Sequence, residues 1–282
     1  MKQIQFFCSL LGLLALSTAS LWAYPSLLGP TGGANLPVAS VVGQGKFNVA
    51  FDAQIVDKST GDGNAYNTRV LLGLSKNVEV GANYVSQSVL DEYGNSYDDI
   101  TNDTFGANFK LLLTNSNTAN LAIGTVYQGN IDDDNFSSVE VYGVVSAVLG
   151  NGNNSSLPGI RGSVGVNWTQ VNGYTYYTYY YPSGYTDSYA VEDSWSAIRP
   201  FASLDIAFPM SNGRAIRIMG EYQMKGSDLP EDIESKPLIS LVLRIPFSDY
   251  FSAEIGTSNA YRGVTGGDKQ NIFVGANLAL GN

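Results

Sequence analysis

The segment KFNVAFDAQIV, residues 46–56, alternates apolar and polar side chains with a period of two. In an extended strand Phe47, Val49 and Phe51 share one face, and Asn48 and Asp52 share the other. A period of two predicts a β-strand, because an amphipathic helix repeats its apolar positions every three to four residues. We therefore expect a strand in this segment, with one apolar and one polar face.

The same alternation recurs along the rest of the chain and predicts an all-β protein. The predicted strands, about twelve with the first, cover residues 46–56, 68–74, 78–85, 104–113, 120–128, 139–149, 160–170, 199–208, 215–223, 238–247, 251–258 and 271–280.

The connections between these strands alternate in length along the chain. Short connections such as SKN at 75–77 and SDY at 248–250 alternate with longer ones such as 89–103 and 172–194. An even number of strands of roughly ten residues, with short turns at one end and long loops at the other, is typical of bacterial outer-membrane barrels. We expect a closed, antiparallel, up-and-down transmembrane β-barrel over residues 46–282, with both termini in the periplasm.

A soluble β-sandwich also alternates, so the chemistry of the two faces has to separate the alternatives. The polar face carries six cations and six anions, which are Asp52, Arg69, Glu79, Lys110, Glu140, Arg161, Arg199, Asp205, Arg217, Glu221, Arg244 and Glu254. The other face is uncharged at the positions Val70, Leu72, Phe109, Leu111, Val141, Val145, Val164, Ile218, Leu241, Leu243, Ile255 and Val274. A charge facing lipid costs about 2–4 kcal/mol near the bilayer midplane, so an uncharged face favours the barrel.

The amino terminus has the pattern of a secretory signal peptide. A lysine at position 2 precedes an apolar run from Phe6 to Leu16, and small residues follow up to Ala23. We expect residues 1–23 to be removed, and with them the single cysteine, Cys8. Residues 24–45 then form a periplasmic or lumenal segment ahead of the barrel.

The expected function is passive passage of small solutes through a narrow porin-like channel. The twelve charged residues of the polar face would line it, and some signs fall close together. If Phe208 pairs with Ile216, Asp205 lies diagonal to Arg217. Across a second turn, if Ile245 pairs with Phe251, Arg244 lies diagonal to Glu254. The alternative is an ion-pair network that fills the lumen of a non-conducting surface or structural barrel.

The composition limits catalysis and nucleic-acid binding. The sequence contains no histidine, the base that outer-membrane phospholipases and palmitoyltransferases need, and no serine–lysine or carboxylate spacing stands out. We expect neither enzyme activity nor a cofactor. A net charge of −10 argues against nucleic acid, and the expected partners are outer-membrane lipid, lipopolysaccharide and the outer-membrane assembly machinery.

The excess negative charge lies in the long loops, at residues 91–103, 132–134, 187–193 and 228–234. An acidic vestibule concentrates cations, so we expect a slight cation preference. Three aspartates at 132–134 would also suit Ca²⁺, but they match no known ligand-loop spacing, and we expect a solvated loop without a metal.

The longest predicted loop is rich in tyrosine, with eight such residues: Tyr174, Tyr176, Tyr177, Tyr179, Tyr180, Tyr181, Tyr185 and Tyr189. We expect a hairpin that continues two strands above the membrane. The tyrosines would either stiffen it through cross-strand pairs or form a recognition platform for surface polysaccharide.

Residues 29–51, GPTGGANLPVASVVGQGKFNVAF, resemble the opening of a diverse group of bacterial outer-membrane barrels that includes exopolysaccharide-associated ones. The residues that carry the resemblance are Gly29, Thr31, Gly32, Pro37, Ala39, Gly43 and Gly45. The resemblance implies an outer-membrane barrel and does not imply a substrate.

Overall fold

The structure is a computed structural model of the chain. It describes residues 26, 30–32, 34–55, 62–90, 96–116, 118–131, 136–150, 158–180, 186–226, 236–261 and 265–280. The expected signal peptide and the aspartates at 132–134 lie outside these residues.

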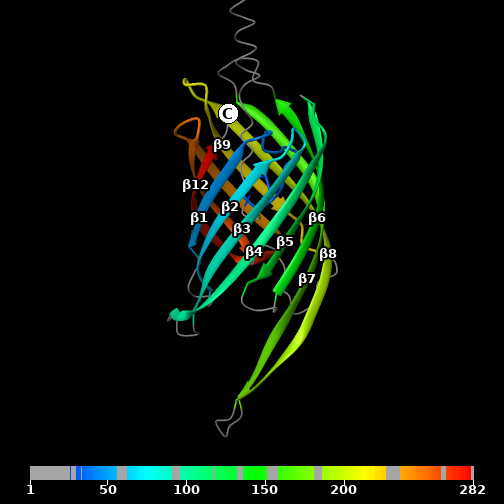
Figure 1. The fold of residues 1–282 in the computed structure, drawn as a ribbon, viewed down its shortest axis with the longest axis vertical. Coiled ribbons are helices and arrows are strands. Elements are labelled where there is room, and N and C mark those ends of the chain that lie inside the picture. Colours follow the sequence, from blue (N-terminus) through cyan, green and yellow to red (C-terminus); the bar gives the residue numbers. More distant parts are fainter. Residues whose placement is uncertain are drawn as a thin grey trace, which may run out of the picture.

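Twelve antiparallel strands form one closed barrel, in which each strand pairs with its neighbours in the chain and β1 pairs with β12 (Figure 1). The strands are β1 Phe47–Ile55, β2 Asp62–Gly73, β3 Val78–Leu90, β4 Ser96–Thr114, β5 Ala119–Asn130, β6 Phe136–Gly150, β7 Gly159–Tyr180, β8 Thr186–Pro209, β9 Ala215–Gln223, β10 Leu238–Pro246, β11 Phe251–Tyr261 and β12 Thr265–Leu280. The expected fold class and strand number are confirmed, and closure excludes the sandwich.

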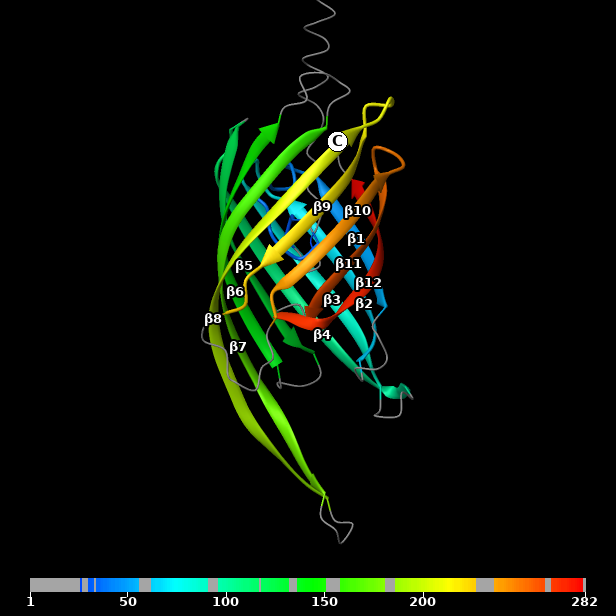
Figure 2. The same ribbon diagram turned by 180° about the vertical axis from the view of Figure 1, so that it is seen from behind.

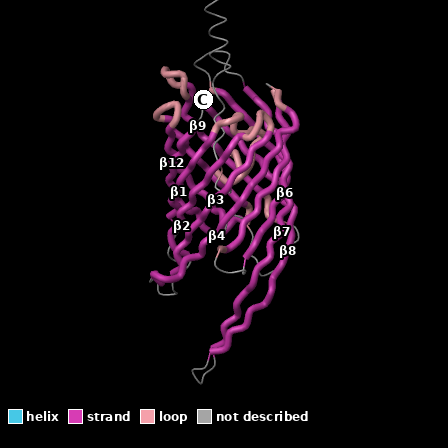
Figure 3. The backbone as a smooth tube through the Cα atoms, viewed as in Figure 1, coloured by secondary structure: helices cyan, strands magenta, loops and turns pink. Residues whose placement is uncertain are grey.

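Strand dominates the described part of the chain, as the magenta tube of Figure 3 shows. No helix among the described residues is long and apolar enough to cross a membrane.

Several strands are longer than the sequence pattern predicts. β4 begins at Ser96 rather than 104, and β8 begins at Thr186 rather than 199. The expected loop 89–103 was therefore wrong at its edges, whereas the hairpin expected to continue two strands within 172–194 is confirmed. The apolar–polar alternation that marks a strand fades in these segments, although the backbone pairing of the ladder continues.

The outward face of the barrel is apolar. All twelve positions expected on the uncharged face are exposed or partly exposed, with Val164 at 61% and Leu241 at 53%. Aromatic rings such as Tyr66, Tyr127 and Trp168 are also exposed on this face. An apolar belt with aromatic side chains on a closed sheet suits a lipid environment, because no backbone edge is left unpaired.

One of the two registers expected across the short turns is confirmed, and the other is wrong. Phe208 pairs with Ile216 as predicted. Arg244 lies directly opposite Glu254 instead of diagonal to it.

The turn between β10 and β11 explains the difference. The amide of Phe247 donates to the carbonyl of Phe251 at 2.9 Å, and the Ser248 hydroxyl accepts from the amides of Tyr250 and Phe251 at 3.1 and 2.9 Å. This tight loop shifts the pairing by two residues.

Strands β7 and β8 continue together well beyond the rest of the barrel wall (Figures 1 and 2). The backbone of this extension includes Tyr174, Tyr176, Tyr177, Tyr179, Tyr180 and Tyr189. Its register places Tyr177 opposite Tyr189, the single direct tyrosine pair among the described positions. Tyr181 and Tyr185 lie outside the described residues.

Candidate functional site: the lumen and its hairpin

The barrel lumen contains a short hairpin formed by the chain ahead of β1. An antiparallel bridge joins Gly32 to Pro37, and the amide of Val38 donates to the carbonyl of Thr31 at 3.1 Å. We call residues 31–42 the lumenal hairpin; Gly33 within it is not described. Most of its described residues are buried, and Ala39 has no exposed surface.

Glycine is required at position 32, where the hairpin folds back on itself. A Cβ atom there would lie 2.1 Å from the carbonyl oxygen of Leu36, a backbone atom that cannot move aside. This glycine and three other residues of the outer-membrane resemblance, Thr31, Pro37 and Ala39, thus lie in the hairpin rather than in the wall.

The base of the lumenal hairpin is held by Glu79 of β3 and Lys110 of β4. The Glu79 carboxylate accepts hydrogen bonds from the amides of Thr31 and Val42 at 2.9 and 2.8 Å, and also from the Thr31 hydroxyl. The Lys110 ammonium lies 3.7 Å from Glu79. It donates to three hairpin carbonyls, those of Thr31 at 2.5 Å, Val38 at 3.2 Å and Ser40 at 3.1 Å.

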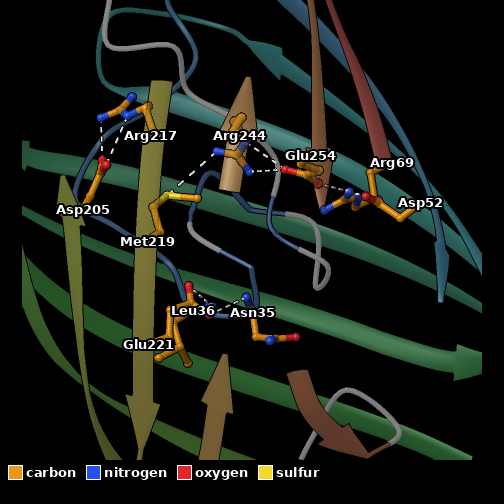
Figure 4. A network of polar contacts seen from close by, with 10 residues as sticks. All are labelled: Asn35, Leu36, Asp52, Arg69, Asp205, Arg217, Met219, Glu221, Arg244 and Glu254. Carbon is orange, nitrogen blue, oxygen red and sulfur yellow. Dashed lines mark hydrogen bonds and ion pairs between the residues drawn. The ribbon is translucent and has the colours of Figure 1, made fainter. Parts of the chain in front are cut away.

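The tip of the hairpin is held by Glu221 of β9. Its two carboxylate oxygens accept from the amides of Asn35 and Leu36 at 2.8 and 3.2 Å, as Figure 4 shows. The Asn35 side chain donates to the hydroxyls of Ser240 and Ser258 at 2.6 and 2.9 Å. Consecutive amides around a carboxylate compensate its charge without a cation.

Apolar side chains of the hairpin pack against three parts of the inner wall. Leu36 and Ala39 join a cluster with wall residues of β4–β6 and β8, Ala34 packs with β9, β10 and β12, and Val42 packs on β2. Complete burial of a leucine contributes roughly 1.5–3 kcal/mol. The inward wall residues of these clusters are Leu71, Leu112, Ala122, Val126, Tyr142, Val144, Phe201, Met219, Val242 and Phe273.

A four-residue ionic network runs along the lumen face of the wall from β2 to β10. Arg69 pairs with Asp52 and lies 3.5 Å from Glu254, which accepts from Arg244 at 2.8 and 2.6 Å (Figure 4). All four side chains are buried. Two cations and two anions make the group neutral, which favours its burial.

Gly275 of β12 gives this network the space to form. It is the register partner of both Asp52 and Glu254, so the two carboxylates flank it. A Cβ atom at this position would lie 2.0 Å from Oδ1 of Asp52 and 3.0 Å from Cγ of Glu254.

We expect Gly275→Ala to lower barrel stability by about 1–3 kcal/mol, because the added methyl group displaces buried charged side chains. Thermal unfolding in detergent measures the change. Gly143→Ala is the matched control, because a Cβ there meets no atom within 4 Å. Equal melting temperatures for the two variants would show that the network does not depend on this space.

Two further ion pairs lie on the wall. Glu140 lies 3.6 Å from Arg199 and accepts from Asn167 at 2.8 Å. Asp205 accepts from Arg217 at 3.2 and 2.5 Å.

Of the twelve charged residues expected on the lumen face, Arg161, Asp205 and Arg217 are partly buried. The other nine are buried, at 0–7% exposure.

Several buried asparagines lack protein partners for their amides. Both side-chain polar atoms of Asn83, Asn108 and Asn277 make no hydrogen bond within the described structure. These residues are 2–6% exposed. Buried amides are almost always hydrogen-bonded, so these positions call for water or a polar solute in the lumen.

The sequence pattern missed two parts of this site. The inward apolar residues were not singled out, although LLL at 111–113 is apolar on both faces and was a usable signal. The sequence predicts a periplasmic or lumenal place for residues 24–45, but it does not predict their contacts with Glu79, Lys110 and Glu221. Among the described residues, no three carboxylate, cysteine or histidine side chains are arranged to hold a metal ion.

Comparison of the sequence with known families and curated proteins found no match. Among solved structures, the chain is similar to the KdgM porin (7% identity, TM-score 0.49, 84% of this chain and 99% of that one). It is also similar to the NanC porin (10%, 0.46, 83% and 100%) and to the translocator domain of the autotransporter NalP from Neisseria meningitidis (10%, 0.49, 85% and 88%).

At TM-scores below 0.5, these likenesses carry no inference about solute or activity. The closed antiparallel barrel with its apolar outer face is itself the architecture of bacterial outer-membrane barrels. The chain therefore has the fold of an outer-membrane β-barrel. Its function has to be argued from the lumen, because this architecture serves several functions.

Proposed function

We propose that the protein is an outer-membrane channel for small polar solutes, and that the lumenal hairpin closes it in the state described. The supporting observation concerns the wall around the hairpin. Its buried amides at Asn83, Asn108 and Asn277 have no partner among the described residues. A wall built only to seal would be expected to satisfy these groups internally. The proposal includes no catalytic step.

The lumenal hairpin contacts the barrel wall through non-covalent interactions alone. Its contacts with the wall are hydrogen bonds, several of them to charged wall side chains, and apolar packing, and it adds no strand to the barrel sheet. Its two ends lie close together, because the amides of Thr31 and Val42 donate to the same carboxylate. The hairpin can therefore leave the lumen while the closed sheet stays intact.

Planar-bilayer recording tests this proposal with the full chain and a variant that lacks residues 31–42, with Pro30 joined to Gly43. We expect brief, rare openings from the full chain and a steady conductance several-fold larger from the variant. Heat-modifiable migration in gels checks that both proteins have folded. A folded variant that conducts no more than the full chain would contradict the proposal and favour a sealed structural barrel.

We also propose a slight cation preference in the open channel, with the termini and short turns on the periplasmic side. The charged groups of the lumen balance, so the acidic long loops would set selectivity. Reversal potentials should show cation preference at low salt and lose it toward about 1 M, where the Debye length is about 3 Å. Anion preference, or a preference independent of salt, would exclude control by the loops.

A second candidate function, adhesion through the tyrosine-rich β7–β8 extension, rests on the length of these strands. β7 and β8 contain 22 and 24 residues, whereas β9 and β10 contain 9 each. The extension therefore exceeds what crossing the membrane requires, since a transmembrane strand needs about 9–11 residues.

Deletion of residues 174–189, with a short glycine-containing turn in their place, should leave barrel insertion and melting nearly unchanged, because the deleted ladder lies beyond the wall. If the tyrosines form a platform, binding to surface polysaccharide should fall, and pull-down with the purified polysaccharide measures it. Unchanged binding would indicate that the tyrosines stiffen the hairpin and do not bind the polysaccharide. Failure to insert would place the segment within the wall.

A further inference from the structure

Two of the twelve charged side chains of the lumen, one cation and one anion, lie outside its ion pairs. Ten of them form four neutral groups, which are the network of Asp52, Arg69, Glu254 and Arg244 and the pairs Glu79–Lys110, Glu140–Arg199 and Asp205–Arg217. Glu221 and Arg161 remain.

Glu221 is compensated by the hairpin, since its two oxygens accept from consecutive backbone amides at Asn35 and Leu36. Arg161 is not compensated in this way. Within the described residues it makes no hydrogen bond or ion pair, and residues 151–157, the undescribed stretch just before β7, contain no acidic side chain.

The nearest carboxylate by register is already engaged. Asp205 lies directly opposite Arg161 on the β7–β8 ladder. Both of its oxygens accept from Arg217, Oδ1 from Nε at 3.2 Å and Oδ2 from Nη2 at 2.5 Å. A bidentate pair of this kind is strong and geometrically fixed. The guanidinium N–H donors of Arg161 are therefore available to another acceptor.

A small cavity adjoins Arg161, between the lumenal hairpin and the wall. It measures about 30 Å³, and one water needs on the order of 10–15 Å³ on the same measure. Its lining includes the three arginines Arg161, Arg217 and Arg244, one carboxylate, Asp205, and the serines Ser40 and Ser203. The lining is thus cationic, with hydroxyl donors on both the hairpin and the wall.

We propose that this cavity binds one small monovalent anion, held by Arg161 together with the hydroxyls of Ser40 and Ser203. The charge follows from the excess of guanidinium groups at the cavity, because Arg161 and Arg217 face the single carboxylate of Asp205 there. The size follows from the cavity, which suits a chloride ion or the head of a formate ion and excludes a sugar acid. The bound anion ties the hairpin to strands β7–β10.

Thermal unfolding in detergent tests this site in the full chain. Sodium gluconate, whose anion is too large for the cavity, is replaced stepwise by sodium chloride or sodium formate at constant ionic strength. We expect a saturable rise in melting temperature of about 2–4 °C in the wild-type protein. Comparison of the two salts shows whether a halide or a carboxylate is preferred.

Four variants make the test specific to this site. Arg161→Gln should abolish the rise, and Arg161→Lys should weaken it because the charge remains without the planar fork. Arg214→Gln should keep the rise in full, because Arg214 lies in an exposed turn and pairs with Asp249 at 3.0 Å. If Arg161→Gln fails to fold, Ser203→Val fills the cavity with all charges kept, and it should also abolish the rise.

No rise in the wild-type protein, or an equal rise in Arg161→Gln, would overturn the proposal. An unsaturated rise that is the same in every variant would indicate a general salt effect and would overturn it equally. None of these outcomes depends on conductance, so the anion site and the proposed channel can fail separately.

Discussion

Lys110→Met should destabilise the barrel by about 3–5 kcal/mol, the usual cost of removing one partner from a buried ion pair. Glu79 and Lys110 both have side chains with no exposed surface. Without the ammonium, the buried Glu79 carboxylate loses its ion-pair partner, and the carbonyls of Thr31, Val38 and Ser40 each lose a donor. Urea unfolding in detergent measures the loss of stability.

The double variant Glu79→Gln/Lys110→Met provides the control. It removes both charges, so no isolated carboxylate remains, and we expect it to be more stable than Lys110→Met alone. A single variant within about 0.5 kcal/mol of wild type would show that the pair does not hold the base of the hairpin, since that is the range for ordinary surface substitutions.

Glu221→Gln should raise the fraction of time that the channel is open by about tenfold. The carboxylate gives both oxygens to the hairpin tip, whereas an amide offers a single neutral acceptor. Hydrogen bonds to a charged group contribute about 1.5–3 kcal/mol and neutral ones about 0.5–1.5, so a loss near 1.4 kcal/mol is expected, which is a tenfold change. Single-channel recording measures the open fraction.

Glu140→Gln is the matched control for this prediction. It removes the same charge from the lumen wall, but Glu140 interacts with Arg199 and Asn167 and makes no hydrogen bond to the described part of the hairpin. We expect its open fraction to stay near that of wild type. An equal rise in both variants would mean that lumen charge, and not the hairpin anchor, controls opening.

The wall of the barrel could be predicted from the sequence because the facing of each strand residue depends on its neighbours in the chain. Alternation assigns Val164 outward and Asp52 inward one residue at a time, and the turn between β8 and β9 gives the Asp205–Arg217 contact directly. Local information failed where a side chain set the turn, as Ser248 does before β11.

The hairpin could not be placed in the same way. Residues 31–42 have no periodic pattern, and their contacts join positions far apart in the chain, such as Asn35 with Glu221 and Ser258, which are 186 and 223 residues away. These contacts require strands β9–β11 to lie together around the hairpin. The inward-facing Leu112 and Phe201 likewise gain apolar partners from the hairpin in addition to those on the wall.

A reversible disulfide between the hairpin and the wall tests most directly whether the hairpin closes the lumen. The amide of Ala39 lies 2.8 Å from the Ser146 hydroxyl of β6, so Ala39→Cys/Ser146→Cys places two thiols within reach. The sequence has one other cysteine, Cys8, inside the expected signal peptide.

The measurement is single-channel recording of this double variant in the Glu221→Gln background, first oxidised and then with a reductant added. The oxidised protein should be silent, and reduction should restore the frequent openings expected of Glu221→Gln. Equal openings before and after reduction, with the disulfide verified by mass spectrometry, would contradict the account, because solutes would then cross without movement of the hairpin.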